Sequence, residues 1–474
     1  MTERLIVALR HSVGQPHVLT GQDCAPFLTD WRKVVTGRAL AVVRPATTQE
    51  VRAVVLACLE HATPIVPQGG NTGQVAGATP DQSGRAVVLQ LGRMNRIRSI
   101  DTANDALVAE AGCVLQAVQE AARAAGRLFP LSLGAEGTCL IGGNLATNAG
   151  GTQVLRYGNA RELTLGIEVV TADGEVWNGL RALRKDNTGY DLRDLYIGSE
   201  GTLGIITAAA LKLFPLPAAQ RTAFAATASI RQAVALLARA RHVLGAELTA
   251  FELMSSTAIE LVPRHFPDQR LPLPLAPWFV LLETSDAESE QRAGERLDAL
   301  LSAALEAEEI GDAAIAHSGA QSTAFWHLRE SITLAVAAEG RCAKHDISIP
   351  TSLMAQFVTT TDALLHKRFP GVRCATFGHL ADGNLHYNIL QPEGQSPAAF
   401  AAIQDDLSLL VHDRVRECGG SISAEQGIGG LRTADLQRYE DPVKIALLRR
   451  IKQALDPRGL MNPGKVLPPH QPEP

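Results

Sequence analysis

The sequence predicts an α+β protein in two lobes, and three observations support this prediction. Segments with apolar residues at helical spacing alternate with short apolar runs typical of buried strands. Glycine is concentrated in one stretch, because 22 of the 41 glycines fall between Gly69 and Gly204. Pro215 and Pro217 then interrupt the pattern and mark a boundary between the two lobes.

The composition is that of a globular protein. The chain has 474 residues with 4% aromatic side chains and a net charge of −5, so neither nucleic acid nor a membrane surface is an expected partner. No apolar run is long enough for a membrane span, and Leu5–Leu9 is too short for the core of a signal peptide. The seven cysteines are scattered without a C-x-x-C pair, which predicts a reduced, cytoplasmic protein without disulfides.

The first lobe mixes helices and strands. Thr47-Thr48-Gln49-Glu50 has the form of a capping box, and Val51, Val54, Val55 and Cys58 follow it at helical spacing. Asp173-Gly174 is a hairpin signal between two short strands. The other elements expected in this lobe are strands at 65–66, 86–91, 106–110, 165–172 and 175–178 and a helix at 114–125.

The second lobe begins with a βαβ unit. Its expected elements are strands at 223–228, 247–253 and 279–283 and helices at 230–243 and 287–307. This alternation predicts a ferredoxin-like sheet covered by helices on one face. From about Ser421 the chain reads as a loop, a helix and a proline-rich tail.

Two glycine-rich stretches indicate a ligand that carries phosphate. They are Pro67–Gly73 and a longer stretch that runs from Gly134 through Gly142-Gly143-Asn144 to Gly151. Backbone N–H groups in such turns can approach phosphate oxygens closely because no Cβ intervenes. Either stretch alone is equally well explained as an ordinary tight turn, but together they favour a large phosphate-bearing ligand. Neither the Rossmann fingerprint nor a Walker A motif is present.

These motifs, with two others, resemble a family of flavoproteins. Pro67–Gly73, Ile141–Gly151 and Gly198–Thr207 look like the vanillyl-alcohol-oxidase-type flavoproteins. Arg184-Lys185-Asp186-Asn187-Thr188-Gly189-Tyr190-Asp191-Leu192 resembles, more narrowly, their FAD-linked D-2-hydroxyglutarate / D-lactate dehydrogenase branch, and the likeness extends from about residue 30 to residue 468.

The resemblance implies a fold and a cofactor. It implies a PCMH-type FAD-binding domain at 1–215, a ferredoxin-like substrate (cap) domain at 216–420, and a C-terminal segment at 421–474 that returns to the FAD domain. Covalent members carry a histidine in the first loop where this chain has Asn71, so we expect non-covalent FAD. The residues expected to hold FAD are Pro67, Gln68, Gly69, Gly70, Asn71, Thr72, Gly73, Leu133, Gly134, Gly137, Thr138, Gly142, Gly143, Asn144, Thr147, Asn148, Gly150, Gly151, Gly204, Ile205, Ile206 and Asn462.

The segment Phe377–Asn388 predicts a hairpin with two histidines on one face. If 381–384 form the turn, His379 lies directly across from His386, and paired Cβ atoms about 4.5–5.5 Å apart allow two imidazoles to share a metal. Asn388, two residues further, projects on the same face. Two histidines alone are also explained as a surface pair, so a third ligand is needed.

The resemblance supplies that third ligand and also a departure from the family. Glu425 matches the family's metal-binding carboxylate, and a His₂-carboxylate set with an open position suits catalytic zinc or another divalent metal. The next residue in the family is a histidine proposed as the base, whereas here it is Gln426, whose amide does not accept a proton near neutral pH. Bound zinc alone can lower the pKa of the hydroxyl. His345 is an alternative base, although strand alternation points it away from the face of Lys344.

Four further side chains are candidates for substrate binding. Arg329 and Thr333 lie four residues apart on one helical face, and the planar fork of arginine matches a carboxylate. Spacing alone favours a surface arginine, but the resemblance assigns Arg329, Thr333 and Lys344 to the substrate carboxylates. Asn388 is the fourth candidate.

The expected activity is oxidation of a D-2-hydroxy acid with FAD and a divalent metal. D-2-hydroxyglutarate is the first choice, followed by D-lactate and D-malate. The chain shows no iron–sulfur or haem motif, so the expected electron acceptor is external, an electron-transfer flavoprotein or a quinone, and a homodimer is compatible with the resemblance. Two alternatives remain open: an oxidase of a related hydroxy acid, and a flavin-binding protein with little turnover because of Gln426.

Overall fold

The computed structural model describes residues 2–468, which divide into two compact units. The first unit contains the residues up to 150, residues 158–216 and the residues from 425 onward, and the second contains 151–157 and 217–424. Residue 1 of the expected FAD-binding domain and residues 469–474 of the expected C-terminal segment lie outside the described residues.

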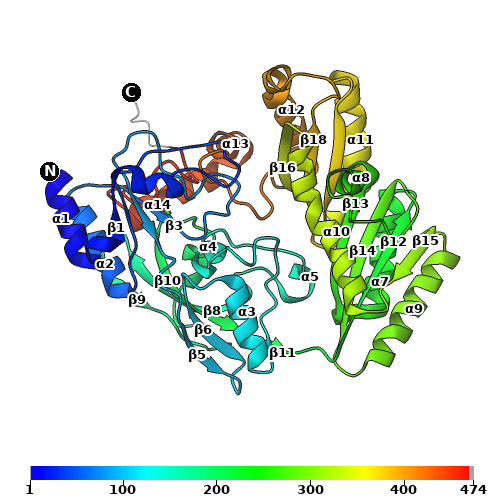
Figure 1. The fold of residues 1–474 in the computed structure, drawn as a ribbon, viewed down its shortest axis with the longest axis horizontal. Helices are drawn as coiled ribbons and strands as arrows, with labels where there is room; N and C mark the ends of the chain where they lie inside the picture. The colour runs from blue at the N-terminus through cyan, green and yellow to red at the C-terminus, as the bar shows by residue number, and fades with distance from the viewer. Residues whose placement is uncertain (1, 469–474) are drawn as a thin grey trace. The chain divides into compact units, whose positions relative to one another are not determined.

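The first unit contains two main sheets and a two-stranded one (Figure 1). The two-stranded sheet pairs β11 (Phe214–Pro215) with β7 (Arg127–Leu128). The four-stranded sheet has the order β1 (Val18–Leu19), β2 (Ala41–Val43), β4 (Val87–Gln90) and β3 (Ile65–Gln68). The five-stranded sheet has the order β5 (Ile97–Asp101), β6 (Ala106–Glu110), β10 (Gly204–Lys212), β8 (Thr164–Thr171) and β9 (Val176–Asn178).

The local signals of this unit are confirmed. The helix α2 (Thr48–Glu60) begins where the capping box predicts, because Thr47 Oγ1 accepts the N–H of Glu50 at 3.1 Å. Asp173-Gly174 turns between β8 and β9, and Gly174 has φ +84°. The remaining helices of this unit are α1 (Thr2–Val13), α3 (Leu115–Ala124), α4 (Ile141–Ala146), α6 (Arg193–Tyr196), α13 (Thr433–Tyr439) and α14 (Pro442–Leu455), with the 3₁₀ turns η1 (Gln15–His17) and η2 (Gly21–Phe27).

The last residues of the described chain pack into the first unit. Met461 is fully buried among Val51, Val87 and Leu89, in the core between α2 and the four-stranded sheet. Its neighbour Leu460 accepts a backbone hydrogen bond from Ile65 of β3 at 2.8 Å. The C-terminal segment therefore contributes to the same core as β3, the strand that leads into the first glycine stretch.

The second unit is built on one seven-stranded sheet whose neighbouring strands are all antiparallel. Its strand order is β15 (Asp312–Ile315), β12 (Ala219–Thr227), β14 (Trp278–Asp286), β13 (Leu248–Ser255), β17 (Arg373–His379), β18 (Asn384–Leu390) and β16 (Cys342–Ser348). The helices are α5 (Val154–Tyr157), α7 (Ile230–Leu244), α8 (Ser256–His265), α9 (Glu290–Glu306), α10 (Gly319–Ala338), α11 (Met354–Arg368) and α12 (Pro397–Glu417), with η3 (Gly245–Glu247), η4 (Thr351–Leu353) and η5 (Leu380–Asp382).

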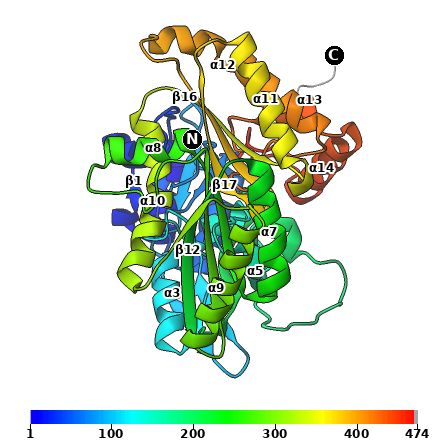
Figure 2. The same ribbon diagram turned by 90° about the vertical axis from the view of Figure 1, so that its right-hand side faces the viewer.

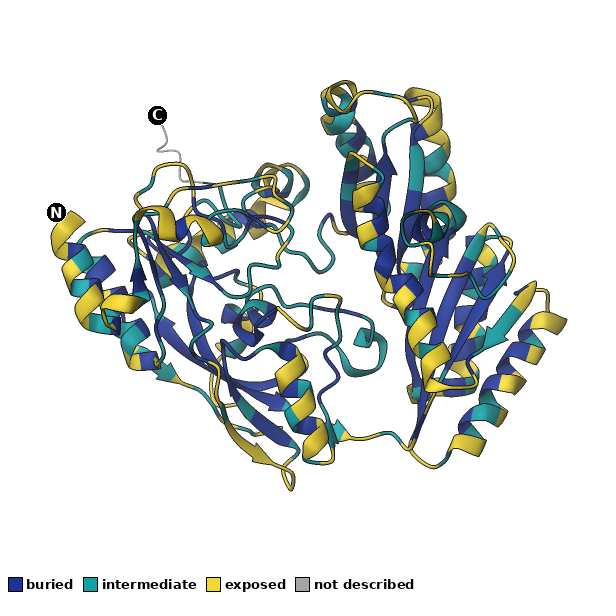
Figure 3. Cartoon of the chain, in the orientation of Figure 1, coloured by how far each residue is buried: buried dark blue, intermediate teal, exposed yellow. Residues whose placement is uncertain are grey.

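Helices cover both faces of this sheet, so the expectation of one covered face is wrong (Figures 1 and 2). Phe224 and Leu281 pack with α8 and α10, whereas the alternate residues Ala223 and Leu282 point to the other face and are also fully buried. The helices α7 and α9 contact β12–β14 as well. Figure 3 shows these strands as almost entirely buried and the helices as exposed only on their outer sides.

The register of the histidine hairpin differs from the predicted one. His386 is paired with Phe377 and not with His379. The register is set by the connection between β17 and β18. In this connection η5 takes up residues 380–382, and Gly383 closes the turn at φ +84°. The shift is two residues, so His379 and His386 still lie on one face of the sheet.

Candidate functional site

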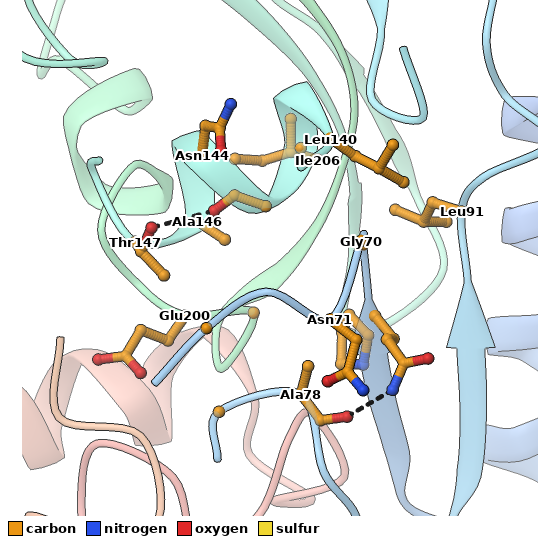
Figure 4. Close-up of a pocket in the computed structure, with 18 of the residues that line it drawn as sticks. Gly70, Asn71, Ala78, Leu91, Leu140, Asn144, Ala146, Thr147, Glu200 and Ile206 are labelled. Atoms are coloured by element: carbon orange, nitrogen blue, oxygen red, sulfur yellow. Dashed lines mark hydrogen bonds between the residues drawn. The ribbon is translucent and has the colours of Figure 1, made fainter. Parts of the chain in front are cut away.

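The glycine-rich stretches of the first unit enclose one cavity. Figure 4 shows it bounded by Leu140, Asn144 and Ile206 on one side and by Asn71 and Ala78 on the other. The full lining is Pro67, Gln68, Gly69, Gly70, Asn71, Thr72, Gly73, Val75, Gly77, Ala78, Leu91, Leu140, Gly142, Gly143, Asn144, Ala146, Thr147, Tyr196, Ser199, Glu200, Gly201, Gly204, Ile205, Ile206 and Gln426.

The glycines of this lining leave the room that a bound group needs. A Cβ added to Gly73 or to Gly143 would meet no protein atom within 4 Å, so both backbones present bare peptide groups to open space. At Gly70 the reason for glycine is different, because a Cβ there would collide with the carbonyl oxygen of Thr138. Open backbone and a mostly apolar rim are what an extended diphosphate ligand with a flat ring requires, so the cavity fits FAD.

Fourteen of the residues expected to hold FAD line this cavity, and eight do not. Those that do not are Leu133, Gly134, Gly137, Thr138, Asn148, Gly150, Gly151 and Asn462. Gly151 belongs to the second unit. Asn462 is buried, and its Nδ2 donates to the carbonyl oxygens of Gly77 and Glu200 at 3.0 and 2.7 Å, so it holds the backbone of two lining residues.

Glu200 is a lining residue that the sequence analysis did not single out. Its backbone has φ +52°, and its carboxylate accepts the N–H groups of Ile428 and Gly429 at 2.8 and 2.7 Å. Burial raises the pKa of Glu200, against the effect of these two hydrogen bonds. A Cβ at Gly427 would lie 2.7 Å from Glu200 Oε1, so the loop can approach the carboxylate only with glycine there. The loop held in this way carries Gln426, which lines the cavity.

The other candidate residues lie on one face of the seven-stranded sheet in the second unit. Across neighbouring strands Glu252 is paired with His379, His386 with Asp346, and Asn388 with Lys344. Directly paired residues point to the same face of a sheet, and so do residues two apart on one strand. The register therefore aligns all six side chains on the face that α8 and α10 cover in part.

The two histidines approach each other closely enough to share an ion. Their ring centroids are 5.6 Å apart, and one ligand atom from each of His379, His386 and Glu425 lies within 4.8 Å of the others. Glu425 directly follows Ala424, whose N–H donates to Oδ2 of Asp346 at 3.2 Å. Two imidazoles and one carboxylate are a donor set that suits a divalent metal such as zinc. Burial lowers the pKa of His386 to about 3, so its imidazole is neutral, which is the form that ligates metals.

Buried carboxylates lie behind both histidines. Glu252 Oε1 lies 2.7 Å from His379 Nδ1, and Asp346 Oδ1 lies 3.7 Å from His386 Nδ1. Although burial acts to raise it, the pKa of Glu252 is lowered to about 2 by His379 and Arg329. Asn384 donates to Asp346 at 2.8 Å and fixes that carboxylate in turn. Such partners orient ligating imidazoles and increase their basicity.

The structure places the expected substrate residues next to these histidines and carboxylates. Arg329 is 6% exposed, so it is not the surface arginine that spacing alone favours, and its Nε donates to Glu252 at 2.8 Å. Thr333 lies one turn later on α10 and is half-buried, as is Lys344 on β16. His345 points to the other face, where it is hydrogen bonded to the carbonyl of Tyr387 and to Ser408, so it is not placed to act as a base beside Lys344.

Sequence reasoning missed Glu200, Glu252 and Asp346. Glu200 lies within the quoted motif Gly198–Thr207, but nothing in the motif indicates that its partners are 228 and 229 residues away. Glu252 is 127 residues from His379 in the chain and is the one charged residue of the buried strand β13. A charged residue within a predicted buried strand was the only signal available for Glu252, and the polar neighbours of Asp346 on β16 gave no such signal.

Comparison with known proteins gives consistent results for both units. Residues 39–179 match the "FAD binding domain" family, and residues 216–466 match the family "FAD linked oxidases, C-terminal domain". The chain is 38% identical over 472 residues to "D-2-hydroxyglutarate dehydrogenase, mitochondrial" of Bos taurus, with 99% of this chain and 84% of the bovine chain covered. It is also 38% identical to "D-2-hydroxyglutarate dehydrogenase" of Xanthomonas citri pv. viticola, with 99% and 98% covered.

Solved structures show a similar fold. A crystal structure of p-cresol methylhydroxylase with substrate bound superposes with a TM-score of 0.78 at 17% identity, covering 98% of this chain and 97% of that one. At this identity the likeness concerns the fold alone. Within residues 2–468 no helix has both the length and the apolar character that crossing a membrane requires.

Proposed function

The chain belongs to the family of FAD-linked oxidases, in the branch of the D-2-hydroxyglutarate dehydrogenases, and from this premise we propose that it is an FAD-dependent dehydrogenase of a D-2-hydroxy acid. The product is the 2-oxo acid. The observation that carries the proposal is 38% identity to D-2-hydroxyglutarate dehydrogenases over 472 residues. These residues include both the glycine-lined cavity and the two histidines His379 and His386. D-2-hydroxyglutarate is the first choice of substrate, with D-lactate and D-malate next.

In this proposal the cavity of the first unit holds FAD without a covalent bond. The open backbone at Gly73 and Gly143 receives the cofactor, and Asn71 stands where a covalent link would need histidine. FAD supplies the two-electron acceptor of the reaction, and the protein supplies position and electrostatics. Asn462 and Glu200 hold the backbone around the cavity. Behind it, Lys452 donates to the carbonyls of Thr202, the residue after the lining residue Gly201, and of Met461 at 2.6 and 2.8 Å.

His379 and His386 of the second unit, together with Glu425, which directly follows that unit in the chain, hold a divalent metal, and zinc is our first choice. The fit rests on the donor set and on the carboxylates behind the two histidines. A metal there supplies a Lewis acid that lowers the pKa of a neighbouring hydroxyl. Arg329, Thr333, Lys344 and Asn388 orient the substrate, with the two cations binding its carboxylates.

The proton acceptor distinguishes this chain from the family pattern. Gln426 lines the flavin cavity, and its amide cannot remove the hydroxyl proton near neutral pH. This one observation favours a second candidate function, a flavin-binding protein with little turnover. Within the main proposal, a metal held by His379, His386 and Glu425 would lower the hydroxyl pKa enough for water to take the proton. The substrate or the rate would then differ from those of the relatives.

Three further parts of the proposal concern the surroundings of the enzyme. Electrons leave to an external acceptor, an electron-transfer flavoprotein or a quinone. The cytoplasm is our proposal for the compartment, although the bovine relative is named as mitochondrial. A homodimer is the proposed assembly.

Anaerobic reduction tests the proposal. Purified, zinc-loaded protein is mixed in turn with D-2-hydroxyglutarate, D-lactate, D-malate and glycolate, and loss of the visible FAD absorbance is followed. We expect bleaching by at least one D-2-hydroxy acid, fastest with D-2-hydroxyglutarate. Protein that holds FAD and is bleached by none of them would be the flavin-binding candidate. Peroxide release in air, with and without an artificial acceptor, separates an oxidase from a dehydrogenase.

A further inference from the structure

Glu252 is buried between two groups that the proposed function treats separately. It lies in the middle of β13, directly across from His379 on β17, and is 1% exposed. One carboxylate oxygen faces the histidine and the other faces Arg329 of α10. A buried carboxylate costs free energy unless it is paired, so both contacts are needed to keep it in this strand.

The contact with His379 selects which ring nitrogen can ligate. Glu252 Oε1 lies 2.7 Å from His379 Nδ1. An ionised carboxylate only accepts hydrogen bonds, so Nδ1 carries a hydrogen and Nε2 is the nitrogen left to ligate a metal. The contact also fixes the angle of the ring relative to the strand.

The contact with Arg329 selects which edge of the guanidinium faces the site. Nε donates to Glu252 Oε2 at 2.8 Å, and Nη2 lies 2.7 Å from the same oxygen. The guanidinium carbon lies 5.1 Å from the centroid of Phe377, so the plane is held by a ring as well. Within the described residues Nη2 has this ion pair with Glu252 and no further acceptor. The Nη1–Nη2 edge is therefore the one placed to receive a carboxylate.

We propose that Glu252 is a positioning residue for both functions at once: it presents Nε2 of His379 to the metal and the Nη1–Nη2 edge of Arg329 to the substrate carboxylate. The inference rests on the proposed function and adds to it that metal ligation and carboxylate recognition share one buried anion. A carboxylate with a purely structural role would neutralise Arg329 and leave metal affinity unchanged.

The same sheet offers a matched control. Glu283 of β14 is also buried, at 7% exposure, and accepts hydrogen bonds from Trp326 at 2.8 Å, Thr222 at 3.3 Å and Thr249 at 3.4 Å. Glu283→Gln and Glu252→Gln each replace a buried acceptor in the same sheet by an amide. The two carboxylates differ because only Glu252 contacts His379, one of the proposed metal ligands.

Zinc titration of the metal-free, FAD-containing protein by calorimetry is the first test. We expect Glu252→Gln to weaken zinc binding by about 10–100-fold, the usual effect of losing a carboxylate behind a ligating histidine, and Glu283→Gln to leave it unchanged. Arg329→Met removes a cation near the site, so zinc binding should not weaken while KM rises. At saturating zinc, Glu252→Gln should also raise KM for D-2-hydroxyglutarate.

The outcomes separate this inference from the proposed function. Wild type that binds zinc, with Glu252→Gln binding it equally well, overturns the role of Glu252 alone. Wild type that takes up no zinc overturns the metal site and this inference with it. If Glu252→Gln does not fold, ¹⁵N-histidine NMR of the wild type decides: zinc should shift Nε2 of His379 while Nδ1 keeps its hydrogen, with the signals assigned through His379→Gln. Ligation through Nδ1 would refute the proposal.

Discussion

Glu200 Oε2 accepts a hydrogen bond from the backbone N–H of Gly429 at 2.7 Å. The other oxygen accepts the N–H of Ile428 at 2.8 Å, so one buried side chain holds two successive residues of the loop that carries Gln426. Glu200 itself is held in a left-handed conformation, with Asn462 donating to its carbonyl at 2.7 Å. The shape of the glycine-lined cavity at Gln426 therefore depends on a residue outside the two glycine-rich stretches.

We predict that Glu200→Gln loosens this loop. An amide group can accept only one of the two N–H groups and faces the other with its own donors, which costs about 1–3 kcal/mol for an unsatisfied buried group. Hydrogen exchange of the Ile428 and Gly429 amides should become faster, and FAD should dissociate more readily. The matched variant Ser199→Ala, which loses only a side-chain bond to the carbonyl of Tyr196, should not change the exchange of these two amides. Unaltered exchange in Glu200→Gln would show that the contact does not hold the loop.

Gly143 tests whether the cavity is the flavin site. Alanine should be tolerated by the fold, because a Cβ there meets no protein atom and alanine favours a helix over glycine by up to about 1 kcal/mol. In the FAD complex the same methyl group occupies ligand space, and overpacking of about 1–3 kcal/mol corresponds to about 5–150-fold weaker binding. Titration of the apoprotein with FAD measures the effect. Gly294→Ala, in helix α9 of the second unit with equally open space, is the control and should bind FAD as the wild type does. Wild-type affinity in Gly143→Ala would place the cofactor elsewhere.

Gln426→His is expected to raise turnover. The imidazole accepts a proton near neutral pH, and a positioned general base contributes about 10²–10⁴-fold to a rate. The gain should appear as pH rises through about 6.5, where the imidazole loses its proton. Turnover with an artificial acceptor across this pH range is the measurement. Gln426→Asn keeps an amide and should gain nothing. Equal or lower turnover of Gln426→His would mean that this site uses a different chemistry.

The stability of the first unit should fall in acid. Although burial acts to raise it, the pKa of Glu168 lies below its ordinary value of 4.5 because of hydrogen bonds from Arg98, Thr48 and Thr207. The unfolded chain takes up this proton at higher pH than the folded chain, so the stabilising contribution is complete above 4.5 and is lost as pH falls through the lower folded pKa. Urea unfolding at a series of pH values below 5 should show this loss. The Glu168→Gln variant should show a smaller slope, and an identical slope would exclude Glu168 as its source.

Local signals were sufficient for much of the fold. The capping box at Thr47 and the Asp173-Gly174 turn depend on residues next to one another in the chain, and each is where the sequence predicts it. The glycine stretches line a cavity, but only in part. The hairpin of His379 and His386 shows the limit of this reasoning. The two histidines lie on one face of the sheet, as predicted. Their register is not as predicted, because it depends on how η5 forms, and a register shifted by two residues leaves every side chain on the same face.

Contacts between distant segments could not be predicted. Nothing near Glu252 in the sequence indicates that a strand pairs it with His379, or that α10 brings Arg329 onto its other oxygen. The burial of both sheet faces was missed for a similar reason. The runs Ala223–Ala226 of β12 and Phe279–Leu282 of β14 are apolar at every position, and such runs do not reveal which side of the sheet is covered. Tertiary partners, and not propensity, determine these features.

The most direct test of the central claim is stereochemical. Zinc-loaded, FAD-containing protein is mixed anaerobically with the D or the L enantiomer of 2-hydroxyglutarate, and the visible absorbance of FAD is recorded over time. The proposed function predicts that the D enantiomer bleaches the flavin within the time of a turnover assay and that the L enantiomer does not. No bleaching by the D enantiomer, or equal bleaching by both, would contradict it.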